Sequence, residues 1–322
     1  MDKFETEIYL RYKQIIQSSV ALAPKECMPE TRHVHMADLL DRYDAFCFDG
    51  YGTLYNRGSF VYPGAMDWFQ MLRRVGKHLR LVTNAASDID EVLARDADKR
   101  GFDFSTEETI SSGCLLRKLV ERLRRVECAD GNAAKPLELR EVYYIGRETG
   151  RNVLKACGIT AVAMDAEPAE PIVAISSAKD TPETYARAVK ILQRPGAILL
   201  VLNSDAWAPK IPDENGVTVR ESVSGALSER LRRDSICDAN GGEGCKTYYL
   251  GKPFPQIWER VKASLPSGSR VLMIGDTLGT DVFGAKVAGF DSALVVGRNV
   301  PAAELEADES ALGIRPDYYL EP

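Results

Sequence analysis

The chain has 322 residues, of which 45% are hydrophobic and 27% are charged, and this ordinary globular composition excludes a disordered, collagenous or coiled-coil protein. The length suggests about two domains, or one domain with a large insertion. The formal net charge of −6 provides no general electrostatic surface for nucleic acid or for an anionic membrane, so a bound phosphate would need a local site.

Neither a membrane span nor a disulfide framework is expected. No apolar run approaches the roughly 18 residues of a spanning helix, and the start, MDKFETEIYLRYKQ, lacks the apolar core of a signal peptide. The 7 cysteines are scattered and include no C-x-x-C pair, unlike those of a zinc site. We therefore expect a cytoplasmic protein with reduced cysteines.

The first forty or so residues are predicted to lead into the fold. A helical repeat of apolar residues covers positions 8–16, and a turn-rich stretch at 22–31 separates it from a helix-like segment at 35–43. Short apolar runs then alternate with longer helical patterns, which is the signature of βαβ units around a parallel sheet. These expected strands and helices lie at 45–48, 65–75, 79–84 and 89–100.

A second α/β unit is expected in the middle of the chain. Its apolar runs lie at 141–146, 171–176 and 197–203, after an exposed loop at 126–140. The first pattern is expected to resume at 247, with strands and helices at 247–253, 255–265, 270–276, 281–290 and 291–297. The chain therefore reads as one α/β domain that is split by an insertion.

Polar residues end several of these predicted strands, where open parallel α/β sheets bind their ligands. Asp49 follows the run 45–48 and opens a turn with two glycines, where a carboxylate either caps the turn or acts as a nucleophile or metal ligand. Thr83 and Asn84 end the next predicted strand, where they either cap a helix or bind an anionic group.

Two further strand ends carry charged residues. Lys252, between a glycine and a proline, is either an ordinary surface lysine or an ammonium group at a site. Asp276 and Asp281 bracket a glycine-containing turn before a helix. They either cap that helix or bind Mg²⁺, which usually takes one or two protein carboxylates and completes its shell with water and substrate phosphate.

Taken together, these strand ends resemble the haloacid dehalogenase (HAD) superfamily, whose four motifs read here as FDGYGTL, VTN, GKP and GDTLGTD between residues 42 and 298. The order of elements is similar to that of NagD-like class IIA hydrolases, which insert a large α/β cap between the second and third motifs. The resemblance implies a Rossmann-like parallel sheet core of residues 1–117 and 247–322, with an inserted α/β cap at 118–246.

The resemblance also implies roles for the strand-end residues. Asp49 would attack phosphorus or carbon and form a covalent aspartyl intermediate that water hydrolyses. Thr83 would hydrogen-bond the transferring group, and Lys252 would neutralise negative charge on nucleophile and substrate. Mg²⁺ would be bound by Asp49, the backbone carbonyl of Tyr51 and Asp276, with Asp281 beside them.

Substrate contacts are expected from the first two motifs and from the cap. The resemblance points to Gly52, Asn84, Asn203 and Asp205. Asn203 and Asp205 could equally fix a loop turn through their own side chains. The substrate is expected to be a small phosphorylated molecule, and a homodimer is possible because caps of this type often take part in dimer contacts.

Tyr51 departs from the family pattern, because phosphatases of the superfamily have a second aspartate there that acts as general acid and base. A phenol with an ordinary pKa near ~10 is a poor base at neutral pH. We expect a Mg²⁺-dependent phosphatase. The alternatives are a dehalogenase-like enzyme, since 2-haloacid dehalogenases share the Asp-x-Tyr-Gly-Thr-Leu motif, a phosphonate hydrolase, and a phosphate-binding pseudoenzyme.

Overall fold

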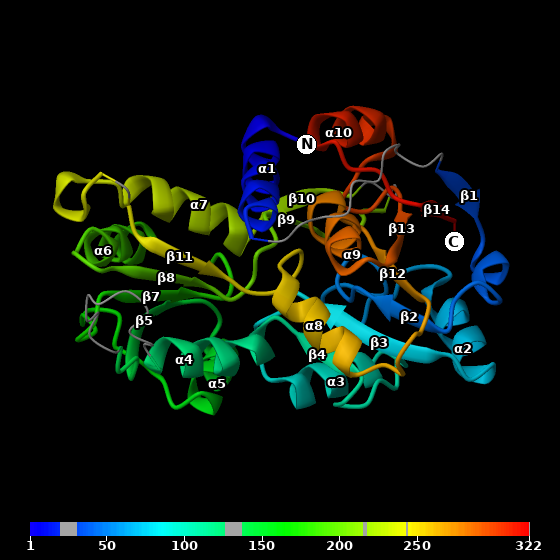
Figure 1. Cartoon of the computed structure of the whole chain (residues 1–322), viewed down its shortest axis with the longest axis horizontal. Coiled ribbons are helices and arrows are strands. Elements are labelled where there is room, and N and C mark those ends of the chain that lie inside the picture. Colours follow the sequence, from blue (N-terminus) through cyan, green and yellow to red (C-terminus); the bar gives the residue numbers. More distant parts are fainter. Residues whose placement is uncertain (20–30, 126–136, 215–217, 243, 322) are drawn as a thin grey trace.

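Two parallel β-sheets flanked by helices organise the chain, as Figure 1 shows. The computed structural model describes residues 1–19, 31–125, 137–214, 218–242 and 244–321. It confirms the predicted α/β class, with a Rossmann-like parallel sheet core and an inserted α/β unit. The expected turn-rich stretch at 22–31 and the expected loop at 126–140 fall mostly outside the described residues.

The larger sheet has 7 strands in the order β1-β14-β13-β12-β2-β3-β4, and neighbouring strands are parallel. The strands are β1 (Arg32–Val34), β2 (Ala45–Phe48), β3 (His78–Thr83), β4 (Thr109–Ser111), β12 (Val271–Gly275), β13 (Asp291–Val295) and β14 (Tyr318–Leu320). β2 is completely buried, as expected for a parallel strand covered on both faces. Because β2 lies between β12 and β3, the residues that follow these three strands share one edge of the sheet.

The helices of this half are α2 (Ala65–Arg74), α3 (Asp90–Asp98), α8 (Pro255–Ala263), α9 (Phe283–Ala288) and α10 (Leu305–Leu312). The helix expected at 281–290 is preceded by a π-helical turn, Leu278–Val282. The helix-like segment at 35–43 forms only the 3-10 turn η1 (Met36–Leu39), in which the Asp38 carboxylate accepts from the backbone N–H of His35. Other 3-10 turns are η2 (Gly113–Leu115), η3 (Glu148–Gly150), η4 (Asp238–Asn240) and η6 (Ala302–Glu304).

The second sheet has 5 parallel strands in the order β11-β8-β7-β5-β6. They are β5 (Glu141–Ile145), β6 (Thr160–Ala161), β7 (Ile172–Ile175), β8 (Ile198–Val201) and β11 (Lys246–Tyr249). The helices here are α4 (Leu116–Arg124), α5 (Arg151–Ala156), α6 (Pro182–Leu192) and α7 (Ser224–Asp234). A small antiparallel hairpin, β9 (Trp207–Pro209) and β10 (Arg220–Ser222), leaves this half after β8.

The chain was expected to return to the core at residue 247, but β11 pairs with the second sheet instead. Lys246–Tyr249 aligns with residues 198–201 of β8, so this strand is an edge of the second sheet and the chain re-enters the core only after it. The difference has a physical reason: the apolar pattern of a segment identifies a strand, whereas its partner is decided by long-range packing.

The N-terminal helix α1 (Lys3–Gln17) connects the two halves, since it packs against both α7 and α10 (Figure 1). The ammonium group of Met1 lies 2.5 Å from a carboxylate oxygen of Asp308 in α10. Glu5, in the first turn, forms an ion pair with Arg220 of β10 at 3.0 Å. The N-terminal segment therefore holds the hairpin of β9 and β10 beside the half that contains the larger sheet. No described helix is long and apolar enough to cross a membrane.

Candidate active site

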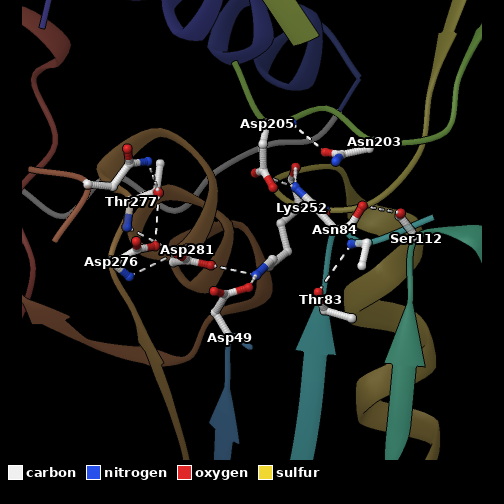
Figure 2. Close-up of polar contacts among 12 residues, drawn as sticks. Asp49, Thr83, Asn84, Ser112, Asn203, Asp205, Lys252, Asp276, Thr277 and Asp281 are labelled. Atoms are coloured by element: carbon white, nitrogen blue, oxygen red, sulfur yellow. Dashed lines mark hydrogen bonds and ion pairs between the residues drawn. The ribbon is translucent and has the colours of Figure 1, made fainter. Parts of the chain in front are cut away.

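Three buried carboxylates meet at the carboxyl edge of the larger sheet (Figure 2). Asp49 follows β2 and Asp276 follows the neighbouring strand β12, while Asp281 lies one turn further along the chain. One oxygen from each carboxylate lies within 4.8 Å of the others. The predicted juxtaposition of these strand ends is therefore present in the structure.

The turn after β12 is built around Asp281, whose Oδ2 accepts hydrogen bonds from the backbone N–H groups of Asp276 and Thr277 at 3.2 and 3.1 Å. Gly275 is required here, because a Cβ at this position would lie 2.2 Å from Cγ of Asp281. The Thr277 hydroxyl donates to Oδ1 of Asp276 at 3.1 Å and accepts from the side-chain amide of Asn299 at 2.7 Å. These contacts orient Asp276.

The other oxygen of Asp276, Oδ2, is buried and has no hydrogen-bond partner. Burial, with the nearby charges of Asp49 and Asp281, raises the pKa of this carboxyl well above its ordinary value. A cluster of hard carboxylate oxygens with one unsatisfied acceptor fits a small divalent cation such as Mg²⁺. Asp49, Asp276 and Asp281 are the residues that could hold it.

Gly52 brings the backbone of the first motif against this cluster. It has φ +104°, a conformation that favours glycine, and a Cβ there would lie 2.0 Å from Oδ2 of Asp276. The expected carbonyl ligand, that of Tyr51, belongs to the peptide bond that joins it to Gly52. The close approach of Asp276 therefore explains why residue 52 is a glycine. The expected contact of Gly52 with substrate stays a prediction.

Lys252 reaches the carboxylates from the loop after β11, that is, from the second sheet. Its Nζ lies 2.6 Å from Oδ1 of Asp49 and 2.7 Å from Oδ1 of Asp281, and the side chain is only 1% exposed. Burial lowers the pKa of Lys252, but the carboxylates of Asp281 and Asp49 outweigh this and raise it. For Asp49 burial has the opposite effect: it raises the pKa of the carboxyl, and the nearby Lys252 only partly offsets this rise. The surface-lysine alternative is thereby excluded.

Asn84 lies behind Lys252 and is 1% exposed. Its side-chain oxygen accepts from the backbone N–H of Lys252 at 2.6 Å, and its Nδ2 donates to the carbonyl of Lys252 at 2.9 Å and to Asp205 at 2.8 Å. Gly251 permits this approach, since its Cβ would lie 2.2 Å from Oδ1 of Asn84. These bonds make Asn84 a positioning residue, and its expected contact with substrate stays a prediction.

Thr83, Asn203 and Asp205 line the cavity above Asp49. The Thr83 hydroxyl accepts from the backbone N–H of Ala85 at 3.1 Å. Oδ1 of Asn203 accepts from the backbone N–H of Asp205 at 2.9 Å, which is the loop turn that the sequence left open as an alternative. Burial raises the pKa of Asp205 to about 6.

The cavity has a volume of about 340 Å³, and Asp49, Lys252 and Asp276 line its inner part. Tyr51 lines it too, half-buried, with its ring packed edge-on against Tyr55 at a centroid distance of 5.1 Å. Burial raises the pKa of the Tyr51 phenol above its ordinary value. Tyr51 is therefore protonated at neutral pH and offers no basic group to the cavity.

Sequence reasoning missed several cavity residues. Thr277 and Asn299 support Asp276, and Thr277 is adjacent to it in the sequence, which was an available signal. Arg57, Arg100 and Arg147 also line the cavity. Of these, only Arg147 carried a signal, because it directly follows the predicted strand at 141–146.

Comparisons with known proteins place this geometry in a family. A model of haloacid dehalogenase-like hydrolases matches residues 46–160, and a second, HAD-hydrolase-like model matches residues 249–321. Among curated proteins, the chain is 26% identical over 303 residues to a 4-nitrophenylphosphatase of Schizosaccharomyces pombe, covering 88% of this chain and 93% of the relative.

Solved structures show the same fold. A possible sugar phosphatase of the HAD superfamily from Cytophaga hutchinsonii has a TM-score of 0.72 and 22% identity, over 91% of this chain and 98% of that one. A glycerol phosphate phosphatase from Mycobacterium tuberculosis in complex with magnesium has a TM-score of 0.61 and 24% identity, over 88% and 76%. The family models together match more than half of the sequence, and the chain therefore belongs to the haloacid dehalogenase superfamily of hydrolases.

Proposed function

We propose that the protein is a Mg²⁺-dependent phosphatase that removes the phosphoryl group of a small phosphorylated metabolite by way of an aspartyl phosphate at Asp49. The observation that carries the proposal is the buried cluster in which Asp49 and Asp281 both contact the Lys252 ammonium, beside the unpartnered oxygen of Asp276. The phosphatase names of the relatives support it. A metal-free dehalogenase would have little use for the two carboxylates of the last motif.

In the first step, a carboxylate oxygen of Asp49 attacks phosphorus and the bond from phosphorus to the ester oxygen breaks. The ammonium of Lys252, fixed 2.6 Å from Asp49, stabilises negative charge on nucleophile and phosphoryl oxygens. The Thr83 hydroxyl, at the end of β3, is available to donate to a phosphoryl oxygen. Asp49, the Tyr51 carbonyl, Asp276 and Asp281 would hold Mg²⁺, which when bound supplies further positive charge to the transition state.

In the second step, water attacks phosphorus, the bond from phosphorus to Asp49 breaks, and inorganic phosphate leaves with the carboxylate restored. The family's second aspartate would accept the proton of this water, and Tyr51 does not replace it because burial raises its pKa. Turnover is therefore expected to favour substrates with good leaving groups, such as aryl phosphate esters and acyl phosphates, and the aspartyl phosphate should hydrolyse slowly.

The second sheet would act as the cap in this proposal. The cap would run from α4 through β11, a few residues beyond the boundary expected from the sequence, and it would contribute Asn203, Asp205 and the Lys252 loop to the site. Closure of a cap excludes water from the reacting groups. Because Lys252 follows a strand of the cap, it would move with the cap, and the position of the cap would determine whether the ammonium group lies beside Asp49.

A screen of purified protein with Mg²⁺ or with a chelator, across phosphomonoesters, phosphonates and 2-haloacids, tests the proposal. We expect Mg²⁺-dependent phosphate release from 4-nitrophenyl phosphate, which the Asp49→Asn variant does not catalyse. Halide release that persists in chelator would instead establish the dehalogenase alternative. Activity on phosphonates alone would establish a phosphonate hydrolase, and turnover of none of these substrates would favour a pseudoenzyme.

A further inference from the structure

Three arginines line the outer part of the active-site cavity, and the proposed chemistry does not use them. Arg57 lies in the loop after the first motif, Arg100 follows α3, and Arg147 follows β5 of the second sheet. The positive charges of all three oppose the rise in the Tyr51 pKa that burial causes. Tyr51 and the three arginines line the same cavity.

The charges around these arginines do not balance. Arg57 is neutralised, because its guanidinium contacts the carboxylate of Glu221 in β10. Asp96, an acidic group that also lines the cavity, forms an ion pair with Lys99 at 3.0 Å.

Arg100 and Arg147 have no carboxylate partner within 4 Å among the described residues. The Arg100 guanidinium lies over the ring of Tyr55, 4.9 Å from its centroid. Its Nη1 donates to the backbone carbonyl of Asp96, whereas its Nε is buried without a hydrogen-bond partner. Arg147 is exposed at the cavity mouth. Two uncompensated positive charges, one from each half of the molecule, therefore face the same space.

Burial indicates which part of a substrate would meet these charges. Asp49 and Lys252 are buried, whereas Arg100 is only partly buried and Arg147 is exposed, and all four residues line the same cavity. A phosphoryl group at Asp49 and Lys252 would then direct its organic remainder toward Arg100 and Arg147. Guanidinium groups bind carboxylates and phosphates with paired hydrogen bonds, and a neutral alcohol offers them no such partner.

We propose that Arg100 and Arg147 form an anion subsite that selects phosphomonoesters whose organic part carries a second anionic group, either a carboxylate or another phosphate. The inference rests on the proposed phosphatase function, because it names the substrate class of the same cavity. Since one arginine belongs to the core and the other to the second sheet, a substrate with two anionic groups would contact both halves at once.

Matched substrates test the subsite. Glycerol 3-phosphate and 3-phosphoglycerate share a three-carbon skeleton and differ by a carboxylate, and fructose 6-phosphate and fructose 1,6-bisphosphate differ by a phosphate. We expect kcat/KM to favour the more anionic member of at least one pair by about 10- to 100-fold, mainly through KM, as for a charge-assisted hydrogen bond. The pair that shows the preference distinguishes a carboxylate from a phosphate ligand.

Arg147→Gln and Arg100→Gln should reduce this preference about tenfold or more, and Arg147→Lys should retain part of it. Arg140→Gln is the matched control, because Arg140 is an exposed arginine of the second sheet's half whose side chain pairs with Glu138 away from the cavity. Equal kcat/KM within both substrate pairs, or a preference that survives both glutamine variants, would overturn the subsite.

Binding separates failure of the subsite from failure of the proposed function. In the Asp49→Asn variant, calorimetry with Mg²⁺ present should show 3-phosphoglycerate or fructose 1,6-bisphosphate binding more tightly than its matched partner. Adding Arg147→Gln should remove the difference. This result would support the subsite even if no ester were hydrolysed. Equal affinities in Asp49→Asn, together with normal hydrolysis of 4-nitrophenyl phosphate by the unmodified protein, would refute the subsite alone.

Discussion

The ammonium of Lys252 lies 2.6 Å from the carboxylate of Asp49, although the two residues are 203 positions apart and follow strands of different sheets. Both side chains are almost completely buried, and a buried charge that loses its partner is costly, by about 3–5 kcal/mol. The contact therefore ties the two halves together at the point where the chemistry is proposed to occur.

Removing the carboxylate charge of Asp276 should weaken Mg²⁺ binding. Asp276→Asn keeps the shape of the side chain, and a loss of at least ~10-fold in affinity is expected, since even partners outside the first coordination shell contribute about 10- to 100-fold. Calorimetric titration with Mg²⁺ measures it, with Asp98→Asn, an exposed aspartate of α3, as control. Unchanged affinity would show that the metal is bound elsewhere.

Glu5 should make stability depend on pH. Burial, only partly offset by Arg220, raises its pKa from 4.5 to about 7 in the folded protein. A carboxyl whose pKa is higher in the folded than in the unfolded state contributes its full stabilisation below pH 4.5. This contribution to the free energy of unfolding, about 3 kcal/mol in total, is lost as pH rises through 7.

Urea unfolding at pH 5 and pH 8 tests this linkage. The free energy of unfolding of the unmodified protein, relative to that of Glu5→Gln, should be lower at pH 8 than at pH 5. Glu7→Gln, on the exposed side of the same helix, should show no such change. If the difference between the unmodified protein and Glu5→Gln is the same at both pH values, Glu5 is not the source of the dependence.

Asn84 is expected to matter for stability as well as for catalysis. Asn84→Asp would place an oxygen against the carbonyl of Lys252 and the carboxylate of Asp205, where an N–H group now donates. We expect the free energy of unfolding to fall by about 1–3 kcal/mol, with a reduced kcat. Asn203→Asp preserves an acceptor for its backbone bond and should be nearly neutral in stability. A raised KM with unchanged stability would instead identify Asn84 as a substrate contact.

Restoring a carboxylate at position 51 should raise turnover of simple alkyl phosphates, up to about 10²-fold, because general acid–base catalysis is the missing contribution. The comparison of Tyr51→Asp with Tyr51→Asn isolates it, since both remove the ring and only one can exchange a proton. Steady-state kcat for glycerol 3-phosphate is the measurement. Equal rates for the two variants would mean that Tyr51 is not in the acid–base position.

Much of the site was predictable because its residues follow strands that the apolar pattern identifies. Asp49, Thr83 and Asp276 lie at the carboxyl ends of three neighbouring strands, so a parallel sheet was enough to predict that they lie close together. Lys252 was found by its motif, but its origin in the second sheet was not, because strand pairing depends on contacts between distant segments.

Other features had no local signal. Arg100 resembles any charged residue at the end of a surface helix, and only the folded chain shows that it shares a cavity with Arg147. The helix at residues 3–17 follows from its apolar repeat. The contacts of Met1 with Asp308 and of Glu5 with Arg220, however, join segments about two to three hundred residues apart.

Acid-quenching the protein during turnover of 4-nitrophenyl phosphate with Mg²⁺, followed by mass spectrometry of the peptide that contains Asp49, shows whether Asp49 is the nucleophile. Because Tyr51 leaves the hydrolytic step without a base, we expect one phosphoryl group on Asp49, and neither this adduct nor phosphate release in Asp49→Asn. Phosphate release by Asp49→Asn at the rate of the unmodified protein would show that Asp49 is not the nucleophile.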